Sequence, residues 1–506
     1  MGEGAAYHPQ SLGGAQPSEP SDPIPANPWP CPSKPAGRIL LLPPEEGRDE
    51  GRLRSSSPNG SWSQCVSKFW RTLLSMIAPP TSAVRSDILA SQDTSASRMD
   101  YLDATRAFAL LLGIVFHASL SFMPIFMAWA VQDVSTSPLV AAFVTVSHAF
   151  RMETFFLIAG LLGHRAFHRK GAVEFVRSRL LRIGVPFVAG WFLLRPLVVS
   201  GWILGSASLR GEVDVPAALW GGVASLATLP AGILTGTHLW FLYYLLWVTA
   251  ALLVVRSCVL ACGRYRDRWI RELDAGVGWL ANSPWAPMSM ALPIAAALGL
   301  MNSWGMDTPD HSLRPHLPVL AVYGGFFALG WMLDRRPESL VAYASPTAGR
   351  WVWAGLGTAV ILWLGSVERD PGYDGFRLVH AAYAVGYAVA TGALVSLTVG
   401  VFRTAFGRPR AWVRYLADAS YWMYLVHLPI VVWLQVAVAE LPFHWTLKLG
   451  FVSAATIAIA LLVYDLFVRS TFLGALLNGR RRDRVLVPWL LGGPSKPGNG
   501  FSTIPE

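Results

Sequence analysis

The sequence predicts an all-α polytopic membrane protein, a bundle of about ten transmembrane helices, for reasons of composition and of spacing. Of the 506 residues, 53% are hydrophobic and only 14% are charged, and the mean hydropathy is +0.41. These values are too apolar for a soluble protein of this size. The apolar residues also fall into separate stretches, each close to the ~20 residues that about 30 Å of hydrocarbon requires.

The predicted transmembrane helices follow one another from residue 106 onward. Their ranges are 106–128, 140–163, 182–206, 238–261, 286–304, 315–333, 351–367, 379–402, 418–439 and 446–469. A further apolar stretch, 219–234, is interrupted by Gly221, Gly222, Pro230 and Gly232. We expect this stretch to be an interfacial or re-entrant piece, because these residues break a spanning helix.

The basic residues predict how the bundle is oriented. Every second connection is rich in Lys and Arg, and these connections (164–182, 256–271, 334–350, 403–414 and 469–484) together hold 23, whereas the four alternate connections together hold four. Because Lys and Arg in short loops stay on the cytoplasmic side, the pattern supports ten helices and places both termini in the cytoplasm. It also accounts for the net charge of +10 without a compact basic domain, so we expect no nucleic-acid partner.

The two ends of the chain differ from the apolar region between them. Residues 1–98 hold 14 of the 36 prolines, and their nine Lys and Arg balance nine Asp and Glu. We expect them to form a disordered Pro/Ser/Gly-rich extension without a cleavable signal peptide. We place the membrane domain at 99–470 and a basic cytoplasmic tail at 471–506.

The residue spacing indicates neither a metal site nor a bound cofactor. No set of His, Cys and carboxylate residues has ligand spacing, and Cys31, Cys65, Cys258 and Cys262 are too few and too scattered for a disulfide framework. The sequence also lacks a P-loop, a Rossmann fingerprint and a GxSxG elbow.

The first predicted helix carries two ionisable residues. In RAFALLLGIVFHASLSF, Arg106 stands at the start and His117 eleven positions later, which is roughly 16 Å deeper and on the same helix face. A single arginine here is usually an interfacial anchor, and a lone histidine is often hydrogen-bonded across a bundle. Ionisable residues at membrane depth are costly, however, and several of them together indicate a functional interior.

Other predicted helices supply further polar residues. SHAFRMETFFLIAG places His148, Arg151 and Glu153 in the middle of the second helix, the fourth helix opens with His238, and the ninth contains His427. Arg151 and Glu153 are two residues apart and do not face each other, so at least one needs a partner on another helix. A structural ion-pair network is the alternative interpretation.

A pair of arginines lies at the cytoplasmic boundary. In RLLRIGVP, Arg179 and Arg182 are three residues apart and are therefore neighbours on one helix face, and Pro186 would kink that helix inward. Guanidinium groups suit phosphate geometry, so the pair predicts a phosphate site. A positive-inside anchor is the alternative.

These motifs together resemble a known family. RAFALLLGIVFH is similar to the signature of the membrane acyltransferase 3 family, and RLLRIGVP is similar to its second motif. FFLIAGLL, HLWFLYYLL and SYWMYLVHLP resemble its further landmarks, in the expected order over about residues 99–470. Within the family the sequence looks most like the glucans biosynthesis protein C group.

The resemblance implies an integral membrane O-acyltransferase of the bacterial cytoplasmic (inner) membrane. The donor would be cytoplasmic acyl-CoA, acetyl-CoA or succinyl-CoA, with its phosphates among Arg106, Arg179 and Arg182. The acceptor would be a hydroxyl of an extracytoplasmic glycan such as a periplasmic glucan. His117 would act as general base or carry the acyl group covalently.

The remaining polar residues receive supporting roles in this hypothesis. Arg106, Arg151 and Glu153 would assist His117, and His148, His238, Trp240 and His427 would bind substrate. Aromatic residues on the far side could stack on sugar rings, although such residues ordinarily form interfacial belts; they are Trp202, Trp220, Trp240, Tyr243, Trp304 and Trp445.

Two other classes of protein compete with this interpretation. A secondary transporter or exporter could use a midplane His/Arg proton relay, but the two halves of the chain show no convincing repeat. An inert membrane scaffold would explain the helices and not their buried charges. The oligomeric state is not predicted.

Overall fold

The computed structural model describes residues 99–208, 211, 213–227, 237–309, 313–370 and 372–486. The predicted extension 1–98 lies outside these ranges, as do residues 228–236 of the predicted interfacial piece and the end of the predicted tail. Within them every regular element is helical, with no strand.

The α-helices are α3 (Asp100–Ser119), α4 (Pro138–His148), α5 (Arg151–Lys170), α6 (Ala172–Arg179), α7 (Val185–Ser208), α8 (Val215–Ala224), α9 (Trp240–Ala261), α10 (Arg266–Asn282), α11 (Ala286–Leu298), α12 (Leu317–Arg335), α13 (Pro337–Tyr343), α14 (Ala348–Leu364), α15 (Phe376–Ala405), α16 (Ala411–Val438), α17 (Trp445–Val463) and α18 (Phe472–Asn478). Four 3-10 turns join them: η2 (Leu120–Phe122), η4 (Thr237–Leu239), η5 (Gly263–Tyr265) and η6 (Gly365–Arg369). Two segments are π-helical, η3 (Leu180–Gly184) and η7 (Tyr464–Val468).

Nine helical segments of the described chain are long and apolar enough to cross a membrane: Asp100–Phe122, Pro138–Lys170, Ala172–Ser208, Trp240–Ala261, Leu317–Arg335, Ala348–Glu368, Phe376–Ala405, Ala411–Val438 and Trp445–Val468. The predicted all-α polytopic class is confirmed. The tenth predicted span, 286–304, is α11, whose 13 residues reach only about 20 Å. The placement of both termini in the cytoplasm stays a prediction.

The second predicted helix is broken at its polar residues. α4 ends at His148 and α5 begins at Arg151, with Ala149 and Phe150 between them outside regular helix. The hydroxyl of Thr391 on α15 donates to the carbonyl of Ala149 at 2.7 Å, which satisfies a backbone group that the break would leave unpaired. His148 and Arg151 therefore stand at two helix ends instead of mid-helix.

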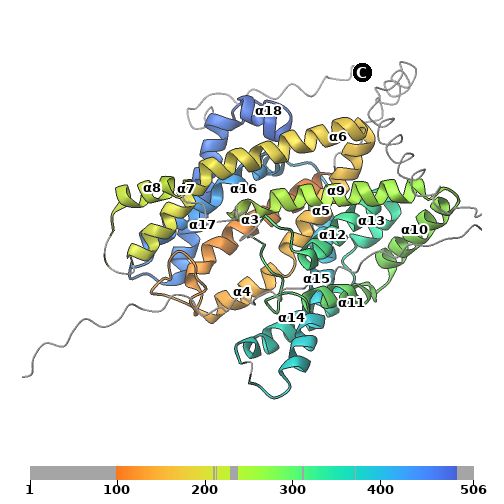
Figure 1. Cartoon of the computed structure of the whole chain (residues 1–506), viewed down its shortest axis with the longest axis horizontal. Helices are drawn as coiled ribbons and strands as arrows, with labels where there is room; N and C mark the ends of the chain where they lie inside the picture. The colour runs from red at the N-terminus through yellow and green to blue at the C-terminus, as the bar shows by residue number, and fades with distance from the viewer. Residues whose placement is uncertain are drawn as a thin grey trace, which may run out of the picture. The chain divides into compact units, whose positions relative to one another are not determined.

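Two glycines let α5 and α12 cross closely. A Cβ on Gly160 would overlap the carbonyl of Phe327, and a Cβ on Gly330 would overlap the carbonyl of Leu157. Without side chains at these positions, the two backbones come into direct contact, as small residues allow between membrane helices. This crossing holds α5, which begins at Arg151, in its place in the bundle (Figure 1).

The Arg-rich connections meet one another through side-chain contacts. Arg165 donates to Asp334 at 2.6 Å, Arg335 is 3.3 Å from Asp274, and Arg403 donates to the carbonyl of Ala344 at 2.9 Å. The connections predicted to share one side of the membrane are thus joined at one end of the bundle.

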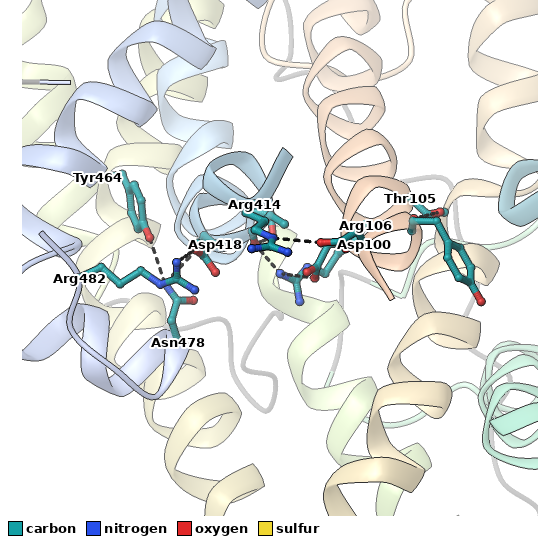
Figure 2. A network of polar contacts seen from close by, with 12 residues as sticks. Asp100, Thr105, Arg106, Arg414, Asp418, Tyr464, Asn478 and Arg482 are labelled. Carbon is teal, nitrogen blue, oxygen red and sulfur yellow. Dashed lines mark hydrogen bonds and ion pairs between the residues drawn. The ribbon is translucent and has the colours of Figure 1, made fainter. Parts of the chain in front are cut away.

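At this same end, α3, α16 and the segment after α17 are joined by ion pairs (Figure 2). Arg414 on α16 donates to Asp100 on α3 at 3.0 Å. Arg482 lies 3.0 Å from Asp418 on α16. Asn478, the last residue of α18, donates to the carbonyl of Asp418 at 3.0 Å. The chain after α17 therefore folds back onto the helix that carries His427.

Candidate active site

One cavity of about 470 Å³ lies in the bundle among α3, α5, α9 and α16. Its lining includes nine of the ten residues that the sequence predicted for the site, which come from five segments of the chain: Arg106, His117, His148, Arg151, Arg179, Arg182, His238, Trp240 and His427. The tenth, Glu153, is buried, with 1% of its surface exposed, but it does not line the cavity. Its predicted assistance to His117 stays a prediction.

The first helix places Arg106 and His117 in the wall of the same cavity, as predicted, but its ends differ from those of the predicted range 106–128. α3 starts six residues before Arg106 and ends two residues after His117. His117 therefore lies in the last helical turn. Asp100 and Asp103 in the first turn favour the helix start, because carboxylates interact well with the N-terminal end of the helix dipole.

Four histidines surround the inner end of the cavity. The ring centroid of His427 is 5.2 Å from that of His117 and 5.8 Å from that of His238. His148 reaches the same region from the end of α4 and stacks on Phe116, which touches His117 edge-on. Sequence positions over 300 residues apart thus form one histidine cluster.

Backbone carbonyls set the tautomers of three of these histidines. Nε2 of His148 donates to the carbonyl of Met306 at 2.8 Å, Nε2 of His238 to that of Leu425 at 2.8 Å, and Nδ1 of His427 to that of Tyr424 at 2.7 Å. A carbonyl only accepts, so each of these nitrogens carries the proton. His238 stands in η4, before the span of α9, where burial lowers the pKa of its imidazole to about 4, so it is neutral near pH 7.

His117 differs from the other three histidines. Its Nδ1 is buried and has no hydrogen-bond partner within the described residues, and its Nε2 makes none either. Unlike its neighbours, this imidazole has no protein group that fixes its tautomer. No described protein group therefore competes with a substrate for the imidazole of this cavity-lining residue.

Arg151 finds its partner on another helix, as the sequence predicted. Its guanidinium carbon lies 4.0 Å from the centroid of the Phe116 ring on α3, and its Nη1 has no hydrogen-bond partner among the described residues. A cation over an aromatic face is attracted by the ring. The guanidinium thus lies within the histidine cluster with a donor left free to polarise a carbonyl group.

Arg179 and Arg182 line the opposite end of the cavity. Arg179 ends α6, where its guanidinium lies over the ring of Phe175, 5.0 Å from the centroid. Arg182 is in the π-helical turn η3, a type of turn that is frequent at functional sites. Pro186 has no N–H for the carbonyl four residues before it, that of Arg182, and the hydroxyl of Tyr421 donates to this carbonyl instead at 2.6 Å.

The segment after α17 also contributes to this end, which the sequence did not predict. Leu477, Asn478 and Arg480 line the cavity. Gly479 has a φ of +81°, and a Cβ there would overlap the guanidinium of Arg182. The pattern of an apolar helix followed by glycine signals a helix end, but no local signal relates it to Arg182.

Two tyrosines of the cavity wall were also missed. Tyr421 and Tyr424 lie on α16 at three-residue spacing before His427, so all three share one face. The Tyr424 hydroxyl donates to the carbonyl of His238 at 2.8 Å, which joins α16 to η4. The spacing in SYWMYLVHLP was the signal that could have identified them.

The far-side aromatic residues do not form one platform. Trp240 lines the cavity and stacks on Tyr323, with centroids 5.7 Å apart. Trp220 is 74% exposed on α8, and Trp304 stacks on His380. Only Trp240 of the predicted set reaches the cavity wall. In the described ranges, no group of three or more His, Cys, Asp or Glu side chains could hold a metal ion.

Comparisons with known proteins agree with the earlier resemblance. The sequence pattern of one family, described as an acyltransferase domain, matches residues 99–465. Among similar proteins is glucans biosynthesis protein C of Escherichia coli strain K12, of O81 (strain ED1a) and of O9:H4 (strain HS). Each is 23% identical over 412 residues, which cover 76% of this chain and 95% of the relative. No solved structure is significantly similar. The chain belongs to the acyltransferase 3 family and is a multi-pass membrane acyltransferase.

Proposed function

We propose that the protein transfers an acyl group, succinyl or acetyl, from cytoplasmic acyl-CoA to a hydroxyl of an extracytoplasmic carbohydrate such as a periplasmic glucan. The observation that carries this proposal is the cavity itself, which has arginines at one end and His117 at the other, its ring without a hydrogen-bond partner among the described residues. The implied setting is the bacterial cytoplasmic membrane, with both termini in the cytoplasm.

The arginine end suits the phosphates of the donor. Arg106, Arg179, Arg182 and Arg480 line this part of the cavity, and guanidinium groups bind phosphate oxygens in pairs of hydrogen bonds. Arg106 already donates to the carbonyl of Ala417 at 2.5 Å, which holds its side chain in the cavity wall. From here to His117 is roughly 16 Å along α3, a distance that the extended arm of coenzyme A would have to cover.

The transfer step takes place at the histidine end. His117 takes the proton of the acceptor hydroxyl, the oxygen attacks the thioester carbonyl, and the C–S bond breaks to leave an ester and the coenzyme A thiol, which receives the proton. Arg151 donates to the carbonyl oxygen as negative charge develops there. In the alternative, His117 attacks the thioester carbonyl and forms an acyl-imidazole as the C–S bond breaks and the thiol leaves with the imidazole proton. The acceptor hydroxyl then attacks the acyl-imidazole, which forms the ester and returns a proton to His117.

The acceptor assignment rests on the relatives, whose name refers to glucan biosynthesis.

A general base must be a neutral imidazole. The three histidines next to His117 are each held by a backbone carbonyl, so they form rigid surroundings for its ring. We propose that His148, His238, Trp240 and His427 orient the acceptor hydroxyl.

The experiment is binding and turnover of acetyl-CoA and succinyl-CoA by the purified full-length protein, with coenzyme A thiol release as the readout. We expect one donor to bind and to be turned over, and addition of a glucan oligosaccharide to accelerate release and yield an acylated product. Succinyl-CoA preference would support a glucan succinylase. Binding of neither donor would overturn the proposal and favour a transporter.

A further inference from the structure

The far side of His117 is covered by a tryptophan that the sequence did not single out. The indole of Trp129 stacks on the imidazole of His117, with centroids 5.8 Å apart and planes 16° apart. His117 lines the cavity but Trp129 does not. The indole therefore covers one face of an imidazole that also lines the cavity, and Trp202 on α7 packs edge-on against the same indole at 5.0 Å.

A buried glutamine holds the indole in this place. Gln435 on α16 is 1% exposed, and its Oε1 accepts from the indole N–H of Trp129 at 2.9 Å. Its Nε2 donates to the carbonyls of His117 and Ala118 at 2.9 and 3.0 Å. One side chain thus binds both the end of α3 and the indole that covers it.

Trp129 belongs to a loop whose two ends are closed together. Asp133 donates its N–H to the carbonyl of Ser121 at 2.8 Å, and the side chain of Gln132 donates to the carbonyl of Met123 at 3.1 Å. Lys448 on α17 is 2.7 Å from Asp133, and both side chains are almost wholly buried. The segment 124–131 is therefore a loop of the compact kind with paired ends, which is frequently functional.

The backbone of this loop is strained at one residue. Ala128, next to Trp129, has a φ of +54° and is the one non-glycine residue of the described chain with positive φ. An alanine in this region is less stable than a glycine would be. Ala130 comes directly after Trp129, and its carbonyl lies where a Cβ on Gly205 of α7 would be. The loop therefore lies directly against a helix backbone.

We propose that Trp129 is the acceptor-side cover of His117, and that the acceptor hydroxyl reaches the imidazole by taking the place of the indole when loop 124–131 moves outward. The proposal rests on the proposed function, including its orientation, and it makes Trp129 a positioning residue. In the closed arrangement the indole excludes water, which would otherwise add to the thioester carbon, break the C–S bond and release the free acid and the coenzyme A thiol.

The first test measures access to position 117 without relying on transfer. Cys31, Cys65, Cys258 and Cys262 are replaced by Ser, and His117→Cys is introduced. A membrane-impermeant methanethiosulfonate reagent is then added to intact cells that produce the full chain. We expect Trp129→Ala to accelerate labelling of the new thiol by about ten-fold or more, because the cover is removed. Trp363→Ala, at a tryptophan that is 78% exposed on α14, is expected to leave the rate unchanged.

The second test follows thiol release from succinyl-CoA and acetyl-CoA without any acceptor, with His117 intact. Trp129→Ala should raise the ratio of hydrolysis to transfer several-fold with donor affinity unchanged, and Trp129→Phe, which keeps a ring but loses the hydrogen bond, should fall between. Equal labelling rates with and without Trp129 in folded protein would overturn the cover. Absence of donor turnover by the wild type would instead refute the proposed function, and the labelling result would still decide the role of Trp129.

Discussion

The imidazoles of His117 and His427 lie with their centroids 5.2 Å apart, although one belongs to α3 and the other to α16. The ring of His427 is fixed through Nδ1 by the carbonyl of Tyr424, whereas that of His117 has no such partner in the part of the chain that the structure describes. One member of the pair is thus held by the protein and the other is free to exchange a proton with a substrate. This difference supports the proposed reacting role of His117 and the proposed supporting role of His427.

Replacing His117 should abolish transfer without abolishing donor binding. His117→Gln removes the base, so we expect the rate of acyl transfer to fall by roughly 100-fold or more while the Kd for acyl-CoA changes little, since the phosphates bind at the other end of the cavity. Thiol release and calorimetric binding would be measured in parallel. His168→Gln, at an exposed histidine that does not line the cavity, is the control. Retained transfer by folded His117→Gln would exclude the general-base and acyl-imidazole mechanisms alike.

Replacing an arginine of the phosphate end should weaken donor binding. A hydrogen bond to a charged group contributes about 1.5–3 kcal/mol, so Arg179→Gln or Arg182→Gln should raise the Kd for coenzyme A by roughly 10- to 100-fold. Calorimetry at two salt concentrations would show a smaller salt dependence in each variant.

Arg177 offers a matched control on the same helix. Its side chain is 70% exposed and pairs with Glu174, and it does not line the cavity. Arg177→Gln should therefore bind coenzyme A like the wild type. A similar loss in all three variants would indicate a general charge effect and contradict a phosphate site at Arg179 and Arg182.

The buried pair of Asp133 and Lys448 should contribute strongly to stability once one partner is removed. The two groups are 2.7 Å apart and no more than 2% exposed as side chains, so Lys448→Met would leave an uncompensated buried carboxylate at a cost of about 3–5 kcal/mol. Thermal unfolding in detergent should show a clearly lower Tm. The double variant Asp133→Leu with Lys448→Met should recover part of this loss, and a wild-type Tm in the single variant would contradict the pair's importance.

The crossing of α5 and α12 should not tolerate a methyl group. Gly160→Ala would place a Cβ against the carbonyl of Phe327, so the helices must separate, at about 1–3 kcal/mol for overpacking. We expect a lower Tm and reduced transfer, because α5 carries Arg151. Gly325→Ala on α12, where a Cβ would meet nothing within 4 Å, should be neutral. Equal Tm values for the two variants would argue against the close crossing.

Much of the candidate site could be predicted because its residues are expensive in a membrane. Arg106, His117, Arg179, Arg182 and His427 are conspicuous in apolar surroundings, and the cost of burying such groups links them to one polar interior. Glu153 was conspicuous for the same reason, yet it is buried beside the cavity and not in its wall. Cost alone identifies a buried polar group and does not say in which direction it points.

Other residues gave no comparable signal. Trp129 is one of 22 tryptophans, and tryptophan is common near membrane interfaces. Its position over His117 depends on a loop that folds back and on Gln435, more than 300 positions away. The break between His148 and Arg151 was missed because an apolar run of spanning length predicts a continuous helix, and the contact that permits the break comes from Thr391.

The sequence by itself determined the membrane class, the family and the residue types of the site, because hydropathy and charge act locally and are readable from composition and spacing. Only the tertiary structure decided that α11 is too short to span, that the segment after α17 meets Arg182, and that Trp129 covers His117. These features depend on which backbones can approach one another and on which buried polar groups find partners. Such pairings join distant parts of the chain, and no local pattern records them.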